Sequence, residues 1–491
     1  MIIPKKLVSA VLFILLAIPL CAERPKNRRE TVLRDGDSSR GSVVVDFELG
    51  SYNTYKIIVP ENAYGIIVRL EDSSEDLDLF ALFDQPISDY QYVDAFSETD
   101  SGEEFLLLTR LTDPPLKTGV YFVDVTYRVP SPPVINSKPV KKVTYTIKYD
   151  IIDYPITEVL AGERKEFTLK PEKGMIERFK VEVPSKVSAM RVDILQSTGD
   201  IDFLIGRDKP LLTKENCDYI KSSYLAREHL LIPGEELNPG TYYLTLIEQM
   251  TTPYDVNGTV LVSFEELPPE EIISPFPEIG QMSPQERAVA ATVEIISGLS
   301  RGSGCLISPD GYILTNYHVI EKMDGKPNTQ VWVALNGSPY EPPEELFIAE
   351  LIDHRKSSDL ALLKIDGTFY GQNLPAGIKF PYYRLGDDRA LGLGDSLKVI
   401  GFPGIGGTGT RVTISLTTGI VSGFEKRGDG FLIKTDSMIN YGNSGGAAVN
   451  GDFELIGLPT IIIGEGSGQM GFIYPLNLVP DEWLKPALSG R

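Results

Sequence analysis

Two stretches of this chain carry the same succession of strand and turn signals. The first reads EDLDLFALFDQPI (75–87) and then LKTGVYFVDVTY (116–127), and the second reads GDIDFLIGRDKPL (199–211) and then LNPGTYYLTLIE (237–248). The aligned positions are Asp76 with Asp200, Asp78 with Asp202, and Gly119 with Gly240. Because the offset stays nearly constant, we interpret the pattern as a repeated domain of about 120 residues.

Alternating apolar residues in both copies follow a turn glycine, as is typical of strands that leave tight turns. Short runs of Tyr, Phe, Val, Ile and Thr recur along the whole chain, separated by Gly (45) and Pro (35). We therefore expect a mainly β protein with two β-sandwiches, over 42–150 and 151–266. The paired aspartates are suitable calcium ligands, although solvated turn residues are the simpler interpretation.

The first 22 residues are predicted to be a signal peptide. Two lysines precede an apolar run, Leu7 to Leu20, which is too short for a spanning helix. Cleavage after Ala22 would leave a flexible polar leader over 23–41. Cys21 leaves open a bacterial lipid anchor, but Leu20 stands where such signals carry a small residue. We expect an exported protein, periplasmic, cell-surface or secreted, with no other membrane attachment.

The net charge of −21 disfavours binding to nucleic acid, and no basic cluster offsets it. A Pro-rich acidic stretch over 267–284 is interpreted as a linker. Ser283, Pro284 and Glu286 then predict a capped helix, which opens a last domain over 285–491. Apolar runs such as TVEIIS, QVWVAL, LALLKI and FLIKT predict strands there.

Outside the signal peptide the chain has two cysteines, Cys217 and Cys305, too few for a disulfide framework or a zinc site of usual spacing. We expect both to pack as small apolar residues. The three histidines are His229, His318 and His354. His354 lies in a charged segment and is expected in solvent, and His229 belongs to the second sandwich.

The last domain presents a histidine, an aspartate and a serine in local contexts that suit catalysis. His318 ends the strand GYILTNYHVI, Asp359 opens the strand DLALLKID, and Ser444 lies in NYGNSGGA. Each residue alone has a simple structural explanation, as a strand-end histidine or a turn residue. Together their order is that of chymotrypsin-type proteases, in which histidine activates serine and a carboxylate orients the histidine.

The glycines around Ser444 suit the same chemistry. Gly442 allows a backbone turn that would direct its N–H and that of Ser444 to one point, and the Gly442–Asn443–Ser444 segment is the expected oxyanion hole. Asp353 competes with Asp359 for the orienting role, but only Asp359 directly precedes the apolar strand. G-x-S-x-G also occurs in esterases, although an α/β-hydrolase places its histidine last.

The blocks GSGCLISPDGYILTNYHVI, DLALLKID, GFPGIGGTG, TTGIVSG, TDSMINYGNSGGAAVN and MGFIYPLNLV resemble those of an HtrA (Deg)-type trypsin-like serine protease domain, over about 285–480. The resemblance implies a double β-barrel and serine endopeptidase activity on protein or peptide substrates, without a cofactor or a catalytic metal. It assigns His318 as general base, Asp359 as its orienter and Ser444 as nucleophile. It also implies a possible homotrimer. Because the segment after Ser444 is short, we do not expect the PDZ domain that members of this family often carry.

The resemblance further implies a specificity pocket formed by Met438, Gly471, Phe472 and Ile473. Met438 is not acidic, so we expect cleavage after small or medium aliphatic residues. The two sandwiches resemble the bacterial pre-peptidase C-terminal (PPC) domain through the D-x-D-x-hydrophobic strand and the later G-x-Y strand. The alternative function is a cell-envelope binding or adhesion protein that uses the protease fold as a scaffold.

Overall fold

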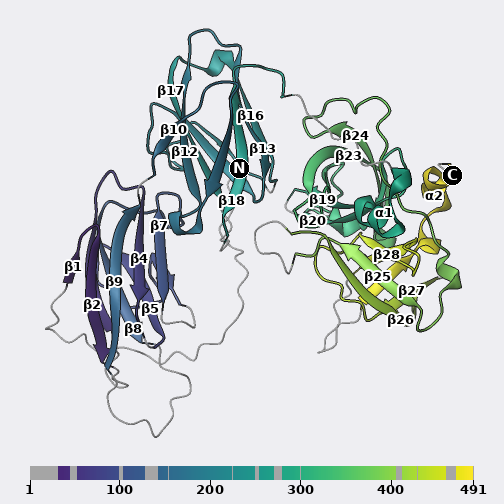
Figure 1. Ribbon diagram of the computed structural model, residues 1–491, viewed down its shortest axis with the longest axis horizontal. Helices are drawn as coiled ribbons and strands as arrows, with labels where there is room; N and C mark the ends of the chain where they lie inside the picture. The colour runs from purple at the N-terminus through teal and green to yellow at the C-terminus, as the bar shows by residue number, and fades with distance from the viewer. Residues whose placement is uncertain are drawn as a thin grey trace, which may run out of the picture. The chain divides into compact units, whose positions relative to one another are not determined.

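The protein is described by a computed structural model (Figure 1), which covers residues 31–44, 52–73, 75–98, 103–127, 142–152, 154–223, 225–248, 254–269, 279–298, 300–404, 412–427, 430–460 and 471–489. Strands dominate these residues, as the sequence predicts for a mainly β protein. The predicted signal peptide and Cys21 lie outside the described residues. No helix in the described segments has the length and apolar character needed to cross a bilayer.

The first compact unit covers residues 1–153 and contains two sheets, in the orders β1-β3-β8-β5-β6 and β2-β9-β4-β7. The sheets share one core, to which β3 contributes Ile57 and β4 contributes Val68. The strands are β1 Thr31–Leu33, β2 Asp37–Val44, β3 Tyr52–Val59, β4 Gly65–Glu71, β5 Leu77–Phe83, β6 Ala95–Ser97, β7 Glu104–Thr109, β8 Gly119–Tyr127 and β9 Lys142–Ile152.

The second copy opens the second compact unit, residues 154–491, and has the matching orders β10-β12-β17-β14-β15 and β11-β18-β13-β16. In both copies the short first strand pairs in parallel, β1 with β3 and β10 with β12. The strands are β10 Ile156–Glu158, β11 Arg164–Leu169, β12 Ile176–Val183, β13 Ala189–Ser197, β14 Ile201–Arg207, β15 Tyr219–Lys221, β16 Glu228–Pro233, β17 Gly240–Glu248 and β18 Val256–Ser263.

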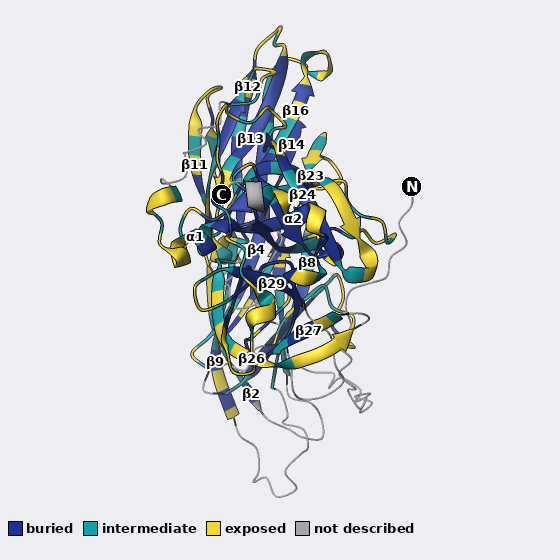
Figure 2. Ribbon diagram, turned by 90° about the vertical axis from the view of Figure 1, so that its right-hand side faces the viewer, coloured by how far each residue is buried: buried dark blue, intermediate teal, exposed yellow. Residues whose placement is uncertain are grey.

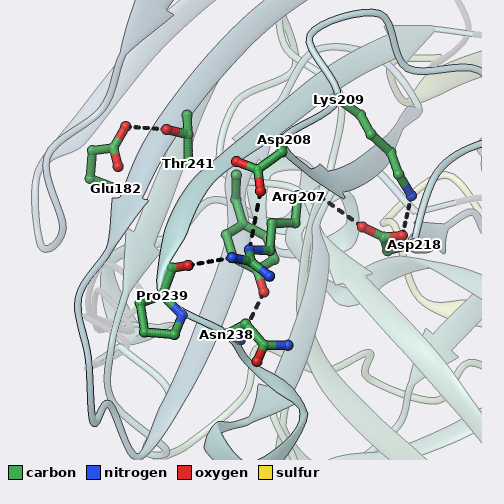
Figure 3. A network of polar contacts seen from close by, with 9 residues as sticks. Glu182, Arg207, Asp208, Lys209, Asp218, Asn238, Pro239 and Thr241 are labelled. Atoms are coloured by element: carbon green, nitrogen blue, oxygen red, sulfur yellow. Dashed lines mark hydrogen bonds and ion pairs between the residues drawn. The ribbon is translucent and has the colours of Figure 1, made fainter.

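The two copies also share hydrogen bonds that the sequence alignment does not show. The carboxylate of Asp94 accepts from the backbone N–H of Phe83 at 2.7 Å, and that of Asp218 accepts from the N–H of Arg207 at 2.8 Å. In the second copy Asp218 also pairs with Lys209 (Figure 3). An equivalent aspartate therefore ties the end of β5 or β14 to the segment that leads into the next strand in each sandwich.

The leader predicted over 23–41 was wrong for residues 31–41. These residues form β1 and most of β2, and β2 pairs with β9 along its whole length. The side chains of β1 are mostly exposed, and a turn in which Asp37 accepts from the N–H of Arg34 at 2.6 Å joins the two strands. Strands at sheet edges keep polar side chains in water, so the segment lacks the apolar alternation that signals a strand.

Two closed six-stranded barrels follow, β19-β20-β21-β24-β23-β22 and β25-β26-β27-β30-β29-β28. The first has β19 Thr292–Ser297, β20 Ser300–Leu306, β21 Tyr312–Thr315, β22 Gln330–Leu335, β23 Glu344–Arg355 and β24 Leu360–Thr368. The second has β25 Ser396–Gly401, β26 Ser415–Arg427, β27 Gly430–Thr435, β28 Ala447–Val449, β29 Leu455–Thr460 and β30 Gly471–Pro475. Most barrel strands are buried, whereas β26 is largely exposed (Figure 2).

The described helices are short. They are α1 Pro284–Ala291 and α2 Asp481–Ser489, with the single-turn 3₁₀ helices η1 Pro171–Lys173, η2 Gly234–Glu236, η3 Ile279–Gln281, η4 Tyr317–Val319, η5 Lys356–Ser358, η6 Asp388–Ala390 and η7 Leu476–Leu478. The capping box predicted for α1 is confirmed. Ser283 Oγ accepts from Glu286 N at 3.2 Å, and Glu286 Oε2 accepts from Ser283 N at 2.8 Å.

Within the second unit, the second sandwich contacts the first barrel through buried polar groups. Arg227 Nη1 donates to the carbonyl oxygen of Glu345 at 2.8 Å, and Ala226 N donates to its carboxylate at 3.2 Å. The Arg227 guanidinium also lies 4.4 Å from the centroid of the Phe369 ring. Because these groups are shielded from water, the contact is a specific one.

Asp200 makes stability depend on pH. Its burial, and then the charge of Asp202, raise its pKa to about 8, while Arg301 acts in the opposite direction. The folded protein then keeps a proton that an unfolded chain releases near pH 4. The stabilising contribution of the protonated carboxyl is complete below pH 4 and is lost as the pH rises through about 8.

We therefore expect Asp200→Asn, which keeps the shape and stays neutral, to lose less stability between pH 6 and pH 9 than the unsubstituted protein. Some loss remains, because burial also raises the pKa of Glu228, to about 7. The unsubstituted protein should lose stability over that interval. Asp208→Asn is the control, because Asp208 is an exposed aspartate just beyond the same strand. A pH dependence that persists unchanged in Asp200→Asn would contradict the assignment.

Candidate active site

His318 follows the end of β21 and lies in the single turn of η4. Asn316, which precedes that turn, donates from its side-chain Nδ2 to the carbonyl oxygen of Asp359 at 2.9 Å. The imidazole is half-exposed, and its Nδ1 lies 2.9 and 3.0 Å from the two carboxylate oxygens of Asp359. A carboxylate can only accept, so Nδ1 carries the hydrogen and Nε2 is left as the basic nitrogen of the neutral ring.

Asp359 joins β23 to β24 just after η5, in the left-handed conformation with φ of 52°. Aspartate tolerates this conformation better than most residues. Besides the imidazole, its carboxylate accepts from the backbone N–H of His318 at 3.0 Å and from Thr460 Oγ1 at 3.4 Å. Three donors therefore hold one carboxylate against the ring, and Thr460 supplies its donor from the second barrel.

Ser444 precedes β28 in the second barrel, and its residue is 6% exposed. It lines one cleft of about 850 Å³ together with His318 and Asp359, so the structure brings the three predicted residues together. Among the described residues, the hydroxyl of Ser444 makes no hydrogen bond to the imidazole. Hydrogen bonds of this kind are often long in ligand-free proteins and tighten when substrate binds.

Hydrogen bonds to two backbone carbonyl groups fix the orientation of the peptides that precede Gly442 and Ser444. The carbonyl oxygen of Tyr441 accepts from Gly404 N at 2.7 Å, and that of Asn443 accepts from Gly446 N at 3.0 Å. A trans peptide directs its C=O and N–H to opposite sides. The N–H groups of Gly442 and Ser444 therefore point away from these donors, and within the described residues neither has a protein acceptor.

Asn443 does not contribute a backbone donor of the same kind. Its N–H donates to the carbonyl oxygen of Asn440 at 3.0 Å, so this group is already used inside the turn. The expected hole of three residues is therefore reduced to two available N–H groups, those of Gly442 and Ser444.

The residues expected to form the specificity pocket lie in different environments. Phe472 lines the cleft, but its neighbours Gly471 and Ile473 are buried. Successive residues of a strand face opposite sides, so only one of the three can face the cleft. Met438 is 63% exposed and lies outside the described lining of the cleft, so it does not act as the floor of a pocket among the residues that the structure describes.

The other titratable candidates have different partners from the His318–Asp359 pair. Asp353 accepts from the indole Nε1 of Trp483 at 3.0 Å. His354 is exposed, as expected, but it lies on β23 and stacks on Tyr317. Burial, and then nearby arginine and lysine charges, lower the pKa of His229 to about 4, and its ring contacts Tyr370.

Cys305 is fully buried in the core of the first barrel, where burial raises the pKa of its thiol, as expected for a packing residue. Cys217 is half-buried. In the described residues, one group of acidic side chains is close enough together to hold a cation. It consists of Asp76, Asp78 and Glu104, with oxygens within 4.8 Å, and belongs to the first unit.

Sequence reasoning missed the residues that support the site, namely Asn316, Thr460 and Ser303. Asn316 is two residues before His318, so its place in NYHVI is a signal that could have been used. Thr460 is the single polar residue of the apolar strand β29. Ser303 lies between two glycines of β20, inside the block GSGCLISP, but its contacts depend on segments distant in the chain.

Residues 302–458 match the family described as trypsin-like peptidase domain. A "Probable periplasmic serine endoprotease DegP-like" of Halomonas elongata is 36% identical over 188 residues, 37% of this chain and 34% of that protein. "Serine endoprotease DegS" of Salmonella typhimurium is 36% identical over 196 residues, 39% of this chain and 49% of that protein. The solved structure of "HtrA-type protease AlgW with tripeptide" is 32% identical and covers 41% of this chain and 61% of that one, with a TM-score of 0.32.

The chain thus spans about a third to a half of the length of these curated relatives. Its C-terminal part is a trypsin-like peptidase domain of the HtrA type, built from two β-barrels, as the sequence blocks predict. The resemblance of the two sandwiches to PPC domains stays a prediction.

The loop that carries Ser444, residues 441–446, is called the serine loop below. Gly445 shows how closely this loop packs against its neighbours. Its φ is +78°, and an added Cβ would lie 2.2 Å from Thr315 Oγ1 and 2.4 Å from the carbonyl oxygen of Ser303. We expect Gly445→Ala to lower the free energy of unfolding by at least about 2 kcal/mol, through backbone strain and overpacking. Chemical denaturation of the full chain measures the effect.

Gly451→Ala is the matched control, because an added Cβ there meets no atom within 4 Å. Its free energy of unfolding should stay within about 0.5 kcal/mol of the unsubstituted protein. Equal effects of the two substitutions would show that the loop is not constrained in the way described.

Proposed function

We propose that this chain is an exported serine endopeptidase that cleaves protein substrates through a Ser–His–Asp acyl-enzyme mechanism. The observation that supports this most directly is the cleft in which Ser444 lies with the hydrogen-bonded His318–Asp359 pair. The matches to proteins named serine endoproteases support the same conclusion.

In the proposed reaction, His318 Nε2 takes the proton of the Ser444 hydroxyl as Oγ attacks the scissile carbonyl carbon. Asp359 keeps the hydrogen on Nδ1 and stabilises the imidazolium. The imidazolium then gives its proton to the leaving amine, and the C–N bond breaks to leave an ester on Ser444. Water, deprotonated by the same imidazole, hydrolyses this ester and restores the serine.

The negative charge that develops on the carbonyl oxygen requires hydrogen-bond donors that are already in place. We assign this role to the N–H groups of Gly442 and Ser444. Two observations support the assignment. The peptides that carry these N–H groups are held through hydrogen bonds to their carbonyl oxygens, and among the described residues neither N–H has a protein acceptor.

The charges of the cleft disfavour basic substrate side chains. Lys426 and Arg427 line it, and of its two glutamates Glu321 pairs with Lys356 and Glu425 pairs with Lys434. A basic substrate residue would therefore meet like charge without a free carboxylate among these lining residues. This argues against cleavage after Arg or Lys, and the preference for small or medium aliphatic residues is a further part of the proposal.

Periplasmic export is part of the proposal, because relatives of the peptidase domain are named periplasmic and residues 1–22 have the pattern of a signal peptide. A homotrimer and a lipid anchor at Cys21 are the finer expectations. Mass determination of the purified exported protein tests both.

The catalytic proposal is tested by labelling residues 23–491 with a fluorophosphonate probe and following casein cleavage in parallel. Ser444→Ala should abolish labelling and reduce cleavage by about 10⁴-fold or more, because the nucleophile is lost. Ser308→Ala is the control: Ser308 is equally buried in the same domain but does not line the cleft.

Labelling that persists in Ser444→Ala would place the reactive residue elsewhere. A folded protein that is not labelled at all would contradict the peptidase proposal and favour a binding protein built on the protease fold.

A further inference from the structure

Ser303 is a fully buried residue of β20, in the first barrel, and all of its polar groups are bonded. Its hydroxyl donates to the carbonyl oxygen of Gly442 at 2.7 Å and accepts from Phe402 N at 2.9 Å. Its backbone N–H donates to the carbonyl oxygen of Ser444 at 2.9 Å. One residue thus holds the carbonyl groups of both residues whose N–H groups are assigned to the oxyanion hole.

The partners of Ser303 lie in the second barrel, whereas His318 and Asp359 belong to the first. The alignment of the serine loop with the His–Asp pair therefore depends on bonds that cross between barrels. Ser303 is itself fixed from within the first barrel, because Thr315 Oγ1 donates to its carbonyl oxygen at 2.7 Å. Its position relative to the strand that leads to His318 is thereby set.

We propose that Ser303 is a positioning residue. It holds the 442–443 and 444–445 peptides, which lie on either side of the peptide that carries the Ser444 N–H, and so fixes the conformation of the loop that presents the oxyanion donors and aligns Ser444 with the His–Asp pair. The proposal rests on the proposed serine peptidase function and adds a residue that does not touch the substrate.

Removal of the hydroxyl would leave two backbone groups unsatisfied, the Gly442 carbonyl and the Phe402 N–H. Phe402 is buried and Gly442 is half-buried, so the loop would shift to find other partners for these groups. Gly442 has φ of +95° and no side chain to resist such a rotation. A rotation of the 442–443 peptide would turn the adjoining 443–444 peptide and move the Ser444 N–H away from the oxyanion.

A larger residue cannot replace Ser303 without strain. A Cβ on Gly446 would lie 3.1 Å from Ser303 Cβ, and a Cβ on Gly401 would lie 3.0 Å from Ser303 Oγ, so the surrounding backbone is already close. Ser303→Ala is therefore the informative substitution, since it removes the hydroxyl and adds no atom.

We expect Ser303→Ala to lower kcat by about 10- to 100-fold with KM changed less than about twofold, because positioning of the oxyanion donors matters in the transition state. The probe is p-nitrophenyl acetate, hydrolysed by the full mature chain. The pH at which the rate is half-maximal should stay where it is, since the His318–Asp359 bonds are untouched, and only the plateau should fall.

Thr292→Val is the matched control. Thr292 is another fully buried hydroxyl of the first barrel, bonded to Ala288 and Tyr383, and it has no contact with the serine loop. It should lose stability without a comparable loss of kcat.

Thr315→Val provides a second variant should Ser303→Ala fail to fold. It frees the Ser303 carbonyl and is expected to lower kcat by about threefold or more, again at constant KM and with an unchanged pH profile.

Variants of Ser303 or Thr315 with the same kcat as Thr292→Val would overturn the proposal, as would a loss expressed in KM or in a displaced pH profile. Failure of the proposed function itself would look different. In that case the unsubstituted protein would not be labelled by fluorophosphonate and would not hydrolyse the ester.

Discussion

The two hydrogen bonds from Ser303 to the carbonyl groups of Gly442 and Ser444, at 2.7 and 2.9 Å, join the barrels where the candidate site is formed. The serine loop has no strand or helix of its own to hold it. Its shape depends on these bonds and on glycines that leave no space between it and the first barrel. The catalytic proposal requires this constraint, because the nucleophile and its base are carried by different barrels.

The first barrel links this site to the second sandwich. Strands β23 and β24 meet at one end in the turn that carries Asp359, and near their other end Glu345 and Phe369 contact Arg227 of the sandwich. The same pair of strands thus positions the carboxylate and forms the docking surface. The sandwich is therefore a structural neighbour of the peptidase domain, connected by buried contacts as well as by the linker.

Much of the fold could be predicted because the signals are local. The repeat, the strand runs of the barrels and the Ser283–Glu286 capping box all depend on residues close together in sequence. The leader was wrong where β1 and β2 are sheet-edge strands with exposed polar side chains. Met438 and the strand 471–473 show a similar limit, since alternation along a strand does not say which side faces a cleft.

The sequence by itself determined the mainly β fold, the class of the peptidase domain, and the identity of His318, Asp359 and Ser444 as the candidate triad. Strand periodicity and turn glycines are properties of neighbouring residues and predict the fold, whereas the class of the peptidase domain follows from the resemblance of its sequence blocks to HtrA-type proteases. Only the tertiary structure decided that Thr460 contacts Asp359, that the N–H of Asn443 is used within its turn, and that Ser303 holds the serine loop. These roles arise where segments distant in the chain meet, so no local pattern of residues encodes them.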